Sequence, residues 1–176
     1  VVSKFDPKVL FHGGNKVLKS NDRGINWQEI SADLTKNDKT KQGLGGGPIT
    51  NESAGGENYN TIACMIESPI TQNELWVGTD DGNVQITRDG GNTWQNVTPT
   101  DMKEGLVNRI DVSPFDAGTA YLAYTRYKFN DFEPHVYITK DYGKTWTQKN
   151  KGIEKEAHVR VVVEDPQRKG LLYAGT

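Results

Sequence analysis

Two short stretches combine carboxylates with side chains that could assist them in chemistry. The first, "TRYKFNDFEPH" (125–135), contains aromatic, basic and acidic side chains close together in the sequence. Its candidate ligand residues are Arg126, Tyr127, Lys128, Asp131, Glu133 and His135. The second, "TDDGN" (79–83), places Asp80 beside Asp81. Aromatic plates next to charged groups suit a sugar or peptide site. Two carboxylates about 5 to 9 Å apart can hydrolyse a glycosidic bond.

Each stretch also has a plainer interpretation. In the first, the two phenylalanines could anchor a long loop whose charges are solvated. In the second, Asp-Asp-Gly is an ordinary turn sequence, and calcium would need more oxygen ligands than it supplies. The histidines, His12, His135 and His158, have no ligand spacing, and Cys64 is the single cysteine. We therefore predict no metal site and no cofactor.

Three octets repeat one pattern, Ser/Thr-x-Asp-x-Gly-x-Thr-Trp. They are "SNDRGINW" (20–27), "TRDGGNTW" (87–94) and "TKDYGKTW" (139–146), and Asn26 is the one departure. Their pattern residues are Ser20, Asp22, Gly24 and Trp27, then Thr87, Asp89, Gly91, Thr93 and Trp94, then Thr139, Asp141, Gly143, Thr145 and Trp146. A catalytic residue would not normally recur in every repeat, whereas a fold-forming hairpin must. We therefore interpret the octets as scaffolding.

Each octet position has a structural task. The glycine supplies the positive φ that a tight strand reversal requires. The Ser/Thr hydroxyl and the Asp carboxylate can accept hydrogen bonds from turn N–H groups that lack ladder partners. The tryptophan is expected to insert its large apolar ring between adjacent sheets, where burial contributes a few kcal/mol.

The sequence around the octets repeats in a fixed order. An apolar strand ending at proline is followed, seven residues on, by a strand with a central aromatic; the pairs are Pro69 and Trp76, Pro114 and Tyr121, and Pro166 and Tyr173. A variable loop, a third strand, the octet and a short strand complete each unit of four strands. Apolar residues on both faces of "TIACMI" and "VRVVV" indicate inner strands buried on both sides. Antiparallel units of this kind around a centre predict an all-β fold, a β-propeller.

The octets resemble the Asp-box, or bacterial neuraminidase repeat, of sialidases, xyloglucanases and sortilin-type sorting receptors. The phrase order "DLTKND…GGPIT…ESP…WVGTDDGNVQITRDGGNTW" also resembles large bacterial secreted proteins with a sortilin-like propeller, which are often labelled glycosyl hydrolases. The resemblance implies a propeller whose Asp-boxes lie on the edge away from the substrate face, and a secreted, periplasmic or cell-surface location. It implies fold, not activity. The Phe-Arg-Ile-Pro signature expected of sialidases is missing.

We expect an incomplete propeller of about three blades, since closed propellers have at least about four. The approximate units are a partial blade 1–33 that opens inside its second strand, a long inter-blade loop 34–59, blades 60–100 and 105–150, and a partial blade 157–176. Loops between second and third strands, and between units, should share the rim opposite the octets, where both candidate stretches fall. The Gly-rich "GLGGGP" (43–48) lacks the Gly-Lys-Ser/Thr ending of a phosphate-binding loop.

Composition limits the partners. The 176 residues carry 21 Lys and Arg against 23 Asp and Glu, a net charge of −2. This balance favours neither nucleic acid nor anionic membranes, and no apolar run approaches the roughly 18 residues of a membrane span. The leading hypothesis is a binding or structural propeller module of a larger secreted or surface protein, whose partners are its remaining blades and a glycan or peptide. The alternative is part of a glycoside hydrolase with paired carboxylates on the loop rim.

Overall fold

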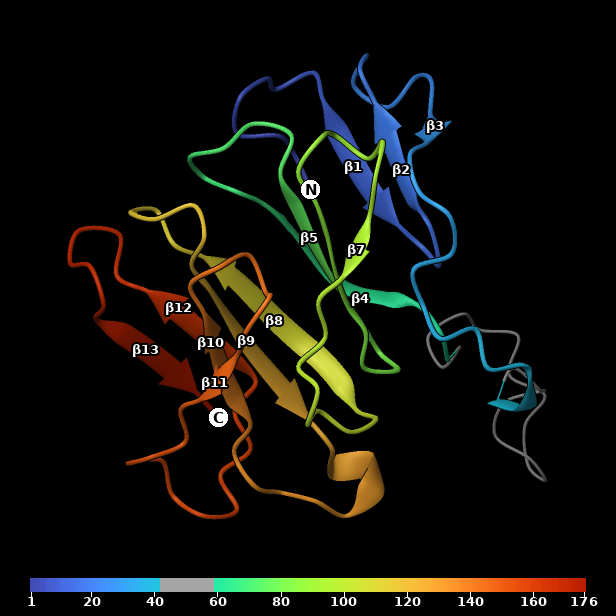
Figure 1. The fold of residues 1–176 in the computed structure, drawn as a ribbon. Coiled ribbons are helices and arrows are strands. Elements are labelled where there is room, and N and C mark those ends of the chain that lie inside the picture. Colours follow the sequence, from blue (N-terminus) through green and yellow to red (C-terminus); the bar gives the residue numbers. More distant parts are fainter. Residues whose placement is uncertain (42–58) are drawn as a thin grey trace.

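The computed structural model of the chain describes residues 1–41 and 59–176. These residues form four antiparallel sheets that follow one another in sequence order (Figure 1). The Gly-rich stretch 43–48, considered above as a phosphate loop, lies outside the described residues.

The first sheet has three strands, β1 (Leu10–Gly13), β2 (Val17–Ser20) and β3 (Gln28–Glu29). Residues 1–3 pair along its inner edge, because Val1 N donates to the Phe11 carbonyl at 2.7 Å and Val2 bridges Leu10. Residues 1–3 therefore lie along β1 on the side away from β2, a pairing that the sequence did not predict. Two apolar residues are too short a run to signal the inner strand by periodicity.

Two four-stranded sheets and one pair follow. The second sheet contains β4 (Ile62–Glu67), β5 (Leu75–Thr79), β6 (Val84–Thr87) and β7 (Gln95–Asn96). The third contains β8 (Leu106–Val112), β9 (Ala120–Thr125), β10 (Val136–Thr139) and β11 (Thr147–Gln148). The fourth is the pair β12 (Val161–Glu164) and β13 (Leu172–Gly175). Two 3-10 turns, η1 (Lys39–Lys41) and η2 (Tyr127–Phe129), lie in the connections that the structure describes.

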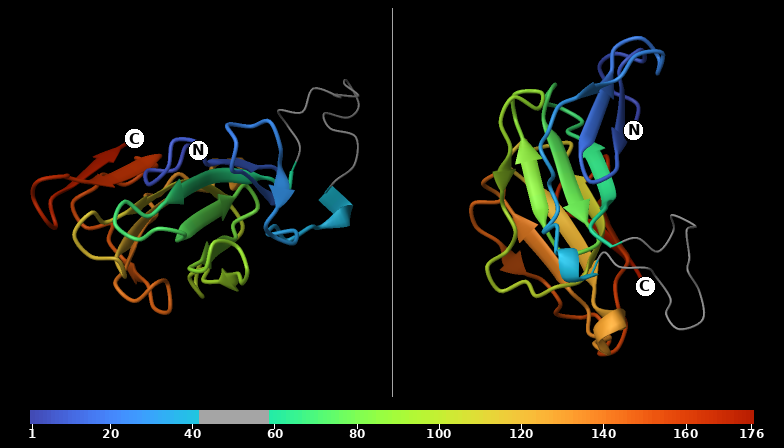
Figure 2. Two further views of the ribbon diagram at one scale, coloured as in Figure 1. Left: turned by 90° about the horizontal axis from the view of Figure 1, so that it is seen from above. Right: turned by 90° about the vertical axis from the view of Figure 1, so that its right-hand side faces the viewer.

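The sheets are arranged as the blades of a propeller. Within each sheet every strand pairs with the next in the chain, and the inner strands β4, β8 and β12 lie next to one another. The two views of Figure 2 show the sheets succeeding one another from the N-terminal strands to β12 and β13. The all-β, incomplete propeller predicted from the sequence is therefore confirmed.

The core lies between the sheets, and the second strand of each blade is its most buried part. Every residue of β5 and β9 is buried, whereas β4 is largely half-buried and β12 combines buried, half-buried and exposed residues. The inner strand β4 does pack on both faces, with Cys64 and Ile66 against one core cluster and Ile62 and Met65 against another, but it is half-buried, less than the sequence predicted. An inner strand has one sheet edge facing the hub, while a second strand has a strand on either side and a sheet against each face.

Gly78 shows how closely two blades approach. A Cβ at Gly78 would lie 2.2 Å from Val107 Cγ1, on the next sheet, and 2.8 Å from the Cys64 sulfur. Burial raises the pKa of the Cys64 thiol to about 12, so this cysteine behaves as a small core residue. The close contact fixes β5 against β8.

Candidate functional site

The octets close their turns with one set of hydrogen bonds. The Thr87 hydroxyl donates to the Asp89 carboxylate at 2.8 Å and accepts from the Gly91 amide at 2.9 Å. The Thr93 hydroxyl and amide donate to the same carboxylate at 2.6 and 2.9 Å. These bonds, the Thr93 hydroxyl first, lower the pKa of Asp89 to about 2 because they favour its ionised form. The hydrogen bonds of the Asp89 carboxylate thus come from residues of its own turn.

The other two octets repeat this geometry. The Asp141 carboxylate accepts from the Thr145 hydroxyl at 2.7 Å. Asn26, the departure from the pattern, donates its side-chain amide to Asp22 at 2.6 Å and so replaces the threonine chemically. Two consecutive residues in each turn have positive φ, namely Arg23 and Gly24, Gly90 and Gly91, and Tyr142 and Gly143. Sequence reasoning had assigned positive φ to the glycine of the pattern alone.

The octet tryptophans differ in what they reach. Trp94 Nε1 donates to the Ile30 carbonyl at 2.8 Å, and Trp146 Nε1 donates to the Val97 carbonyl at 2.6 Å. Each acceptor follows the last strand of the preceding sheet, so these two rings tie adjacent sheets together. Trp27 Nε1 instead donates to a carbonyl of its own turn, and the residue is 43% exposed.

The candidate ligand residues lie on the rim away from the octets. In Figure 1 the 3-10 turns η1 and η2 lie at the lower side, whereas the β2–β3 connection that carries the first octet is at the top. The rim is built from the 79–83 and 125–135 loops and from the connections between sheets. We refer to it as the loop rim.

An ion pair with a histidine organises the 125–135 loop. Arg126 Nη1 donates to Asp131 Oδ2, and His135 Nε2 lies 3.2 Å from the same oxygen. Burial raises the pKa of Asp131, but the Glu133 amide and the Arg126 guanidinium outweigh it and hold this pKa below its usual value. The His135 ring also packs 4.7 Å from the Tyr124 ring, centroid to centroid. The structure thus brings Arg126, Asp131 and His135, three of the candidates from the sequence, into direct contact.

Exposed aromatic rings surround this ion pair. Tyr127, Phe129 and Phe132 are 39%, 44% and 43% exposed. The His158 ring, from the next connection, lies 6.5 Å from the Tyr127 ring and 6.3 Å from the Phe132 ring. These rings present apolar faces to solvent beside a fixed carboxylate.

The remaining charged candidates of this loop are solvated. Lys128 is exposed, and Glu133 Oε1 lies 4.0 Å from Lys155 Nζ in a pair whose side chains are mostly exposed. Such a pair contributes little to stability. These two side chains are accessible to a ligand, and among residues 1–41 and 59–176 they have no further partner that would orient them.

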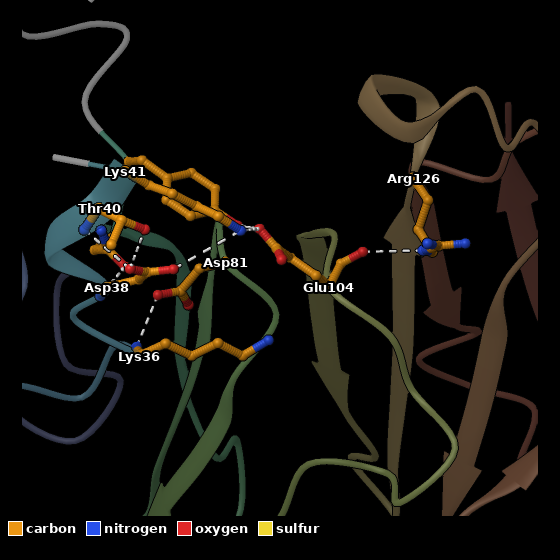
Figure 3. A network of polar contacts seen from close by, with 9 residues as sticks. Lys36, Asp38, Thr40, Lys41, Asp81, Glu104 and Arg126 are labelled. Atoms are coloured by element: carbon orange, nitrogen blue, oxygen red, sulfur yellow. Dashed lines mark hydrogen bonds and ion pairs between the residues drawn. The ribbon is translucent and has the colours of Figure 1, made fainter. Parts of the chain in front are cut away.

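Glu104 connects three loops of the rim (Figure 3). Its carboxylate accepts from Lys41 Nζ at 2.5 Å and from the Tyr59 hydroxyl. Its backbone carbonyl accepts from Arg126 Nε at 2.9 Å. Burial raises the pKa of Glu104, but Lys41 and Tyr59 outweigh it and the net shift is downward. Sequence reasoning missed this cluster, because partners 63 and 45 residues from Glu104 leave no local pattern.

Asp80 and Asp81 are engaged by the protein. Asp81 is fully buried, and its carboxylate accepts the Lys36 amide at 2.7 Å and the Thr79 hydroxyl. Asp80 accepts the Thr61 amide and hydroxyl, each at 2.8 Å. Burial, with a smaller effect of the neighbouring Asp81 charge, raises the pKa of Asp80. The two carboxylates therefore bind the backbone at Lys36 and at Thr61 to the turn between β5 and β6.

Two further features are reported for the described part of the chain. No group of three or more His, Cys, Asp or Glu side chains within residues 1–41 and 59–176 could hold a metal ion. No helix found there has the length and apolar character of a membrane span.

The chain matches no family model. A stretch of 82 residues is 29% identical to an oligoxyloglucan-reducing end-specific xyloglucanase of Emericella nidulans, covering 45% of this chain and 9% of that protein. An ancestral GH74 enzyme superimposes with a TM-score of 0.64 at 19% identity, over 99% of this chain and 21% of its own. The GH74 xyloglucanase of Xanthomonas campestris gives 0.62 at 16% identity, over 98% and 25%.

The chain resembles xyloglucanase propellers. At these identities the solved structures show the fold alone, and the chain spans between 9% and 25% of the length of the three proteins. The comparisons therefore show that the chain shares the propeller fold of these glycoside-hydrolase structures.

Proposed function

We propose that residues 1–176 form a ligand-binding segment of a carbohydrate-recognising propeller, within a larger secreted or cell-surface protein. The ligand is an oligosaccharide, and it lies on the loop rim opposite the octets. Two observations support this proposal: the similar proteins are named for acting on xyloglucan, and the rim combines exposed rings with fixed polar groups.

The exposed rings beside the Arg126–Asp131 pair carry the proposal. A sugar offers an apolar C–H face and a ring of hydroxyls, so it needs an aromatic surface and oriented acceptors at once. Phe132 and Tyr127 supply the surface, and Asp131, held by Arg126 and His135, supplies an oriented carboxylate. Large rings left exposed together mark a binding surface more often than they mark a core.

The ionisation of the rim favours binding over hydrolysis. A glycosidic bond is cleaved with a carboxylic acid whose pKa is raised, so that it can donate a proton near neutral pH. The pKa values of Asp131 and Glu104 are shifted the other way. Both residues accept hydrogen bonds from cations, which suits anchoring a hydroxyl rather than protonating a leaving group.

A second candidate function is a contribution to glycoside hydrolysis, and Asp80 favours it. Its pKa is raised by burial, and it lies next to a second carboxylate, Asp81. For Asp80 to donate a proton to a sugar, the carboxyl group would have to exchange its bonds to Thr61. This candidate therefore requires a rearrangement that the binding function does not.

A titration with xyloglucan-derived oligosaccharides, followed by amide chemical shifts, tests the proposal. We expect saturable shifts confined to the 125–135 loop and its neighbours. Phe132→Ala should weaken binding by about 2- to 10-fold, the factor that one aromatic contact contributes. The control is Phe115→Ala, which removes a 38% exposed ring from a loop on the octet side and should leave binding unchanged. Shifts at the octet turns alone, or equal effects of both variants, would contradict the site.

Product analysis with the same oligosaccharides separates the two functions. Binding without turnover supports the proposal, whereas cleavage that disappears in Asp131→Asn or Glu133→Gln would overturn the binding-only function. Cleavage lost only in Asp80→Asn would assign the chemistry to the second candidate. Saturable binding of peptides with no response to oligosaccharides would replace the glycan by a peptide ligand at the rim.

A further inference from the structure

The contact between the second and third sheets contains a buried glutamate. Glu74, the residue before β5, is fully buried, and its Oε1 accepts the Trp76 Nε1 proton at 3.0 Å. The Trp76 ring packs edge-on against Trp146 of the third sheet, with centroids 6.2 Å apart and planes at 82°. Within the described part of the chain, no hydrogen-bond donor meets Glu74 Oε2. An ionisable group therefore touches the rings that join the two sheets.

This carboxyl group is not a requirement of the blade. In each sheet one second-strand residue lies opposite the first octet residue, and the residue before it is Val9 in the first sheet, Glu74 in the second and Thr119 in the third. Neither of the other two residues can carry a charge. Burying a carboxylate without a partner costs free energy, so a glutamate at this position calls for an explanation other than folding.

Arg88 is the cation beside Glu74, but in the structure it contacts the third sheet. Its guanidinium lies 3.7 Å from the centre of the Tyr142 ring, in a cation–π contact with the octet 139–146. Burial raises the pKa of Glu74, and the Trp76 hydrogen bond and the Arg88 charge offset this only in part. The arrangement thus favours an uncharged Glu74, with Arg88 held by the ring of Tyr142.

The other acidic groups of this region bond elsewhere. Glu67, on the neighbouring strand β4, pairs with Leu75 and so faces the opposite side of the sheet, where it accepts the Lys4 amide at 2.8 Å. The carboxylates of the adjacent turns accept backbone amides of their own turns; they are Asp89, Asp116 and Asp141. Arg88 and the Tyr142 phenol are thus the charged and titratable groups that the second and third sheets turn toward Glu74, and the Arg88 charge is the one that acts on it.

We propose that Glu74 and Arg88 form a proton-controlled switch in the contact between the second and third sheets. While Glu74 keeps its proton, Arg88 stays on the Tyr142 ring and fastens the octet 139–146 to the second sheet. When Glu74 releases its proton to solvent, its carboxylate attracts Arg88 away from that ring. The switch lies on the octet side of the propeller and does not depend on the proposed glycan site.

The direction of the switch follows from the pKa of Glu74. A folded-state pKa above the ordinary value of 4.5 means that the fold favours the protonated form. The resulting stability is present below about pH 4.5 and is lost as the pH rises through the raised pKa. The octet aspartates have the opposite dependence, because their lowered pKa values reduce stability as the pH falls. The contact between the sheets therefore weakens on the alkaline side of the Glu74 titration.

The indole N–H of Trp76 reports the charge of Glu74 directly. In NMR spectra of the chain its signal should move with a single midpoint above pH 4.5, and this movement should be absent in Glu74→Gln. The control is Glu67→Gln, which changes an equally buried carboxylate on the other face and should keep the titration. A Trp76 signal that does not titrate above pH 4.5, or that titrates equally in Glu74→Gln, would overturn the proposal.

The position of Arg88 separates a switch from a glutamate that merely titrates. Protons of Arg88 that lie over the Tyr142 ring are shifted upfield, and this shift should disappear through the same midpoint in the unmodified chain and persist in Glu74→Gln. Above the midpoint, the Trp146 indole N–H, which bonds to the Val97 carbonyl, should exchange about 2- to 5-fold faster in the unmodified chain than in Glu74→Gln, the factor that one cation–π contact contributes. Titration of Trp76 with an unchanged Arg88 shift, seen in the unmodified chain alone, would overturn the proposal, as would equal exchange rates at Trp146.

Discussion

At the residue scale, the surroundings of the aspartates shift their pKa values in opposite directions. Hydroxyl and amide donors of its own turn lower the pKa of Asp89, and the Glu133 amide and Arg126 lower the pKa of Asp131. The pKa of Asp80 is raised, because the effect of burial outweighs the hydrogen bonds from the Thr61 amide and hydroxyl. The chemistry available to each aspartate is therefore set by its immediate donors, which a residue name alone does not specify.

The octet carboxylates make stability depend on pH. The pKa of Asp89 is about 2 in the folded chain against 3.8 for the ordinary group, and those of Asp22 and Asp141 are also lowered. A folded-state pKa below the unfolded value gives stability that is present above about pH 4 and lost as the pH falls through 2. Melting temperatures measured between pH 5 and 2 should therefore decline.

Asp89→Asn tests this dependence. The variant should melt at a lower temperature near neutral pH, because the ionised acceptor is lost, and should show a shallower decline in acid. An acid decline as steep as that of the unmodified chain would show that Asp89 does not contribute to it.

At the element scale, the strands pack through close approaches that tolerate little added volume. Gly78→Ala should destabilise the chain by about 1 to 3 kcal/mol, because the new methyl group would overlap Val107 and Cys64 across the sheet contact. Gly14→Ala is the control, since a Cβ there meets nothing within 4 Å; its effect should stay within about 0.5 kcal/mol. Urea unfolding of both variants measures the difference, and similar values would contradict a tight contact between β5 and β8.

Elements with a repeated local signal could be predicted from the sequence. The octets specify their own turns, and alternating or apolar runs bounded by proline specify the strands, so the blades were recognisable. The inner pairing of residues 1–3 was missed because only Val1 and Val2 carry a signal. The burial of the inner strands was overstated, since apolar composition does not distinguish a strand at the hub from one between two others.

At the scale of the whole molecule, the loop rim depends on contacts that no local pattern reveals. Arg126, Asp131 and His135 lie within ten residues of one another, so sequence reasoning could group them. The Glu104 cluster joins residues of separate connections, and only the propeller brings them to one rim. The loop rim could therefore be predicted from the sequence only in part, because the Glu104 cluster forms only when the chain folds.

Hydrogen exchange should follow the position of each strand in the molecule. The amides of β5 and β9 are buried and have a paired strand on both sides, so we expect them to exchange most slowly. The amides of β13 that are not bonded to β12 should exchange fastest among the strands. Protection of β13 comparable to that of β9 would show that its edge is covered in solution.

The central claim is that the octet tryptophans join adjacent sheets, which places the ligand rim on the opposite side. Equilibrium urea unfolding of Trp94→Ala, Trp146→Ala and Trp27→Ala tests it most directly. The first two variants should lose about 2 to 4 kcal/mol, because each removes a packed ring bonded to the preceding sheet. Trp27→Ala should lose less than about 1 kcal/mol, because its hydrogen bond stays within its own turn and its ring contact, with His12, stays within its own sheet. Equal losses in all three variants would contradict the claim.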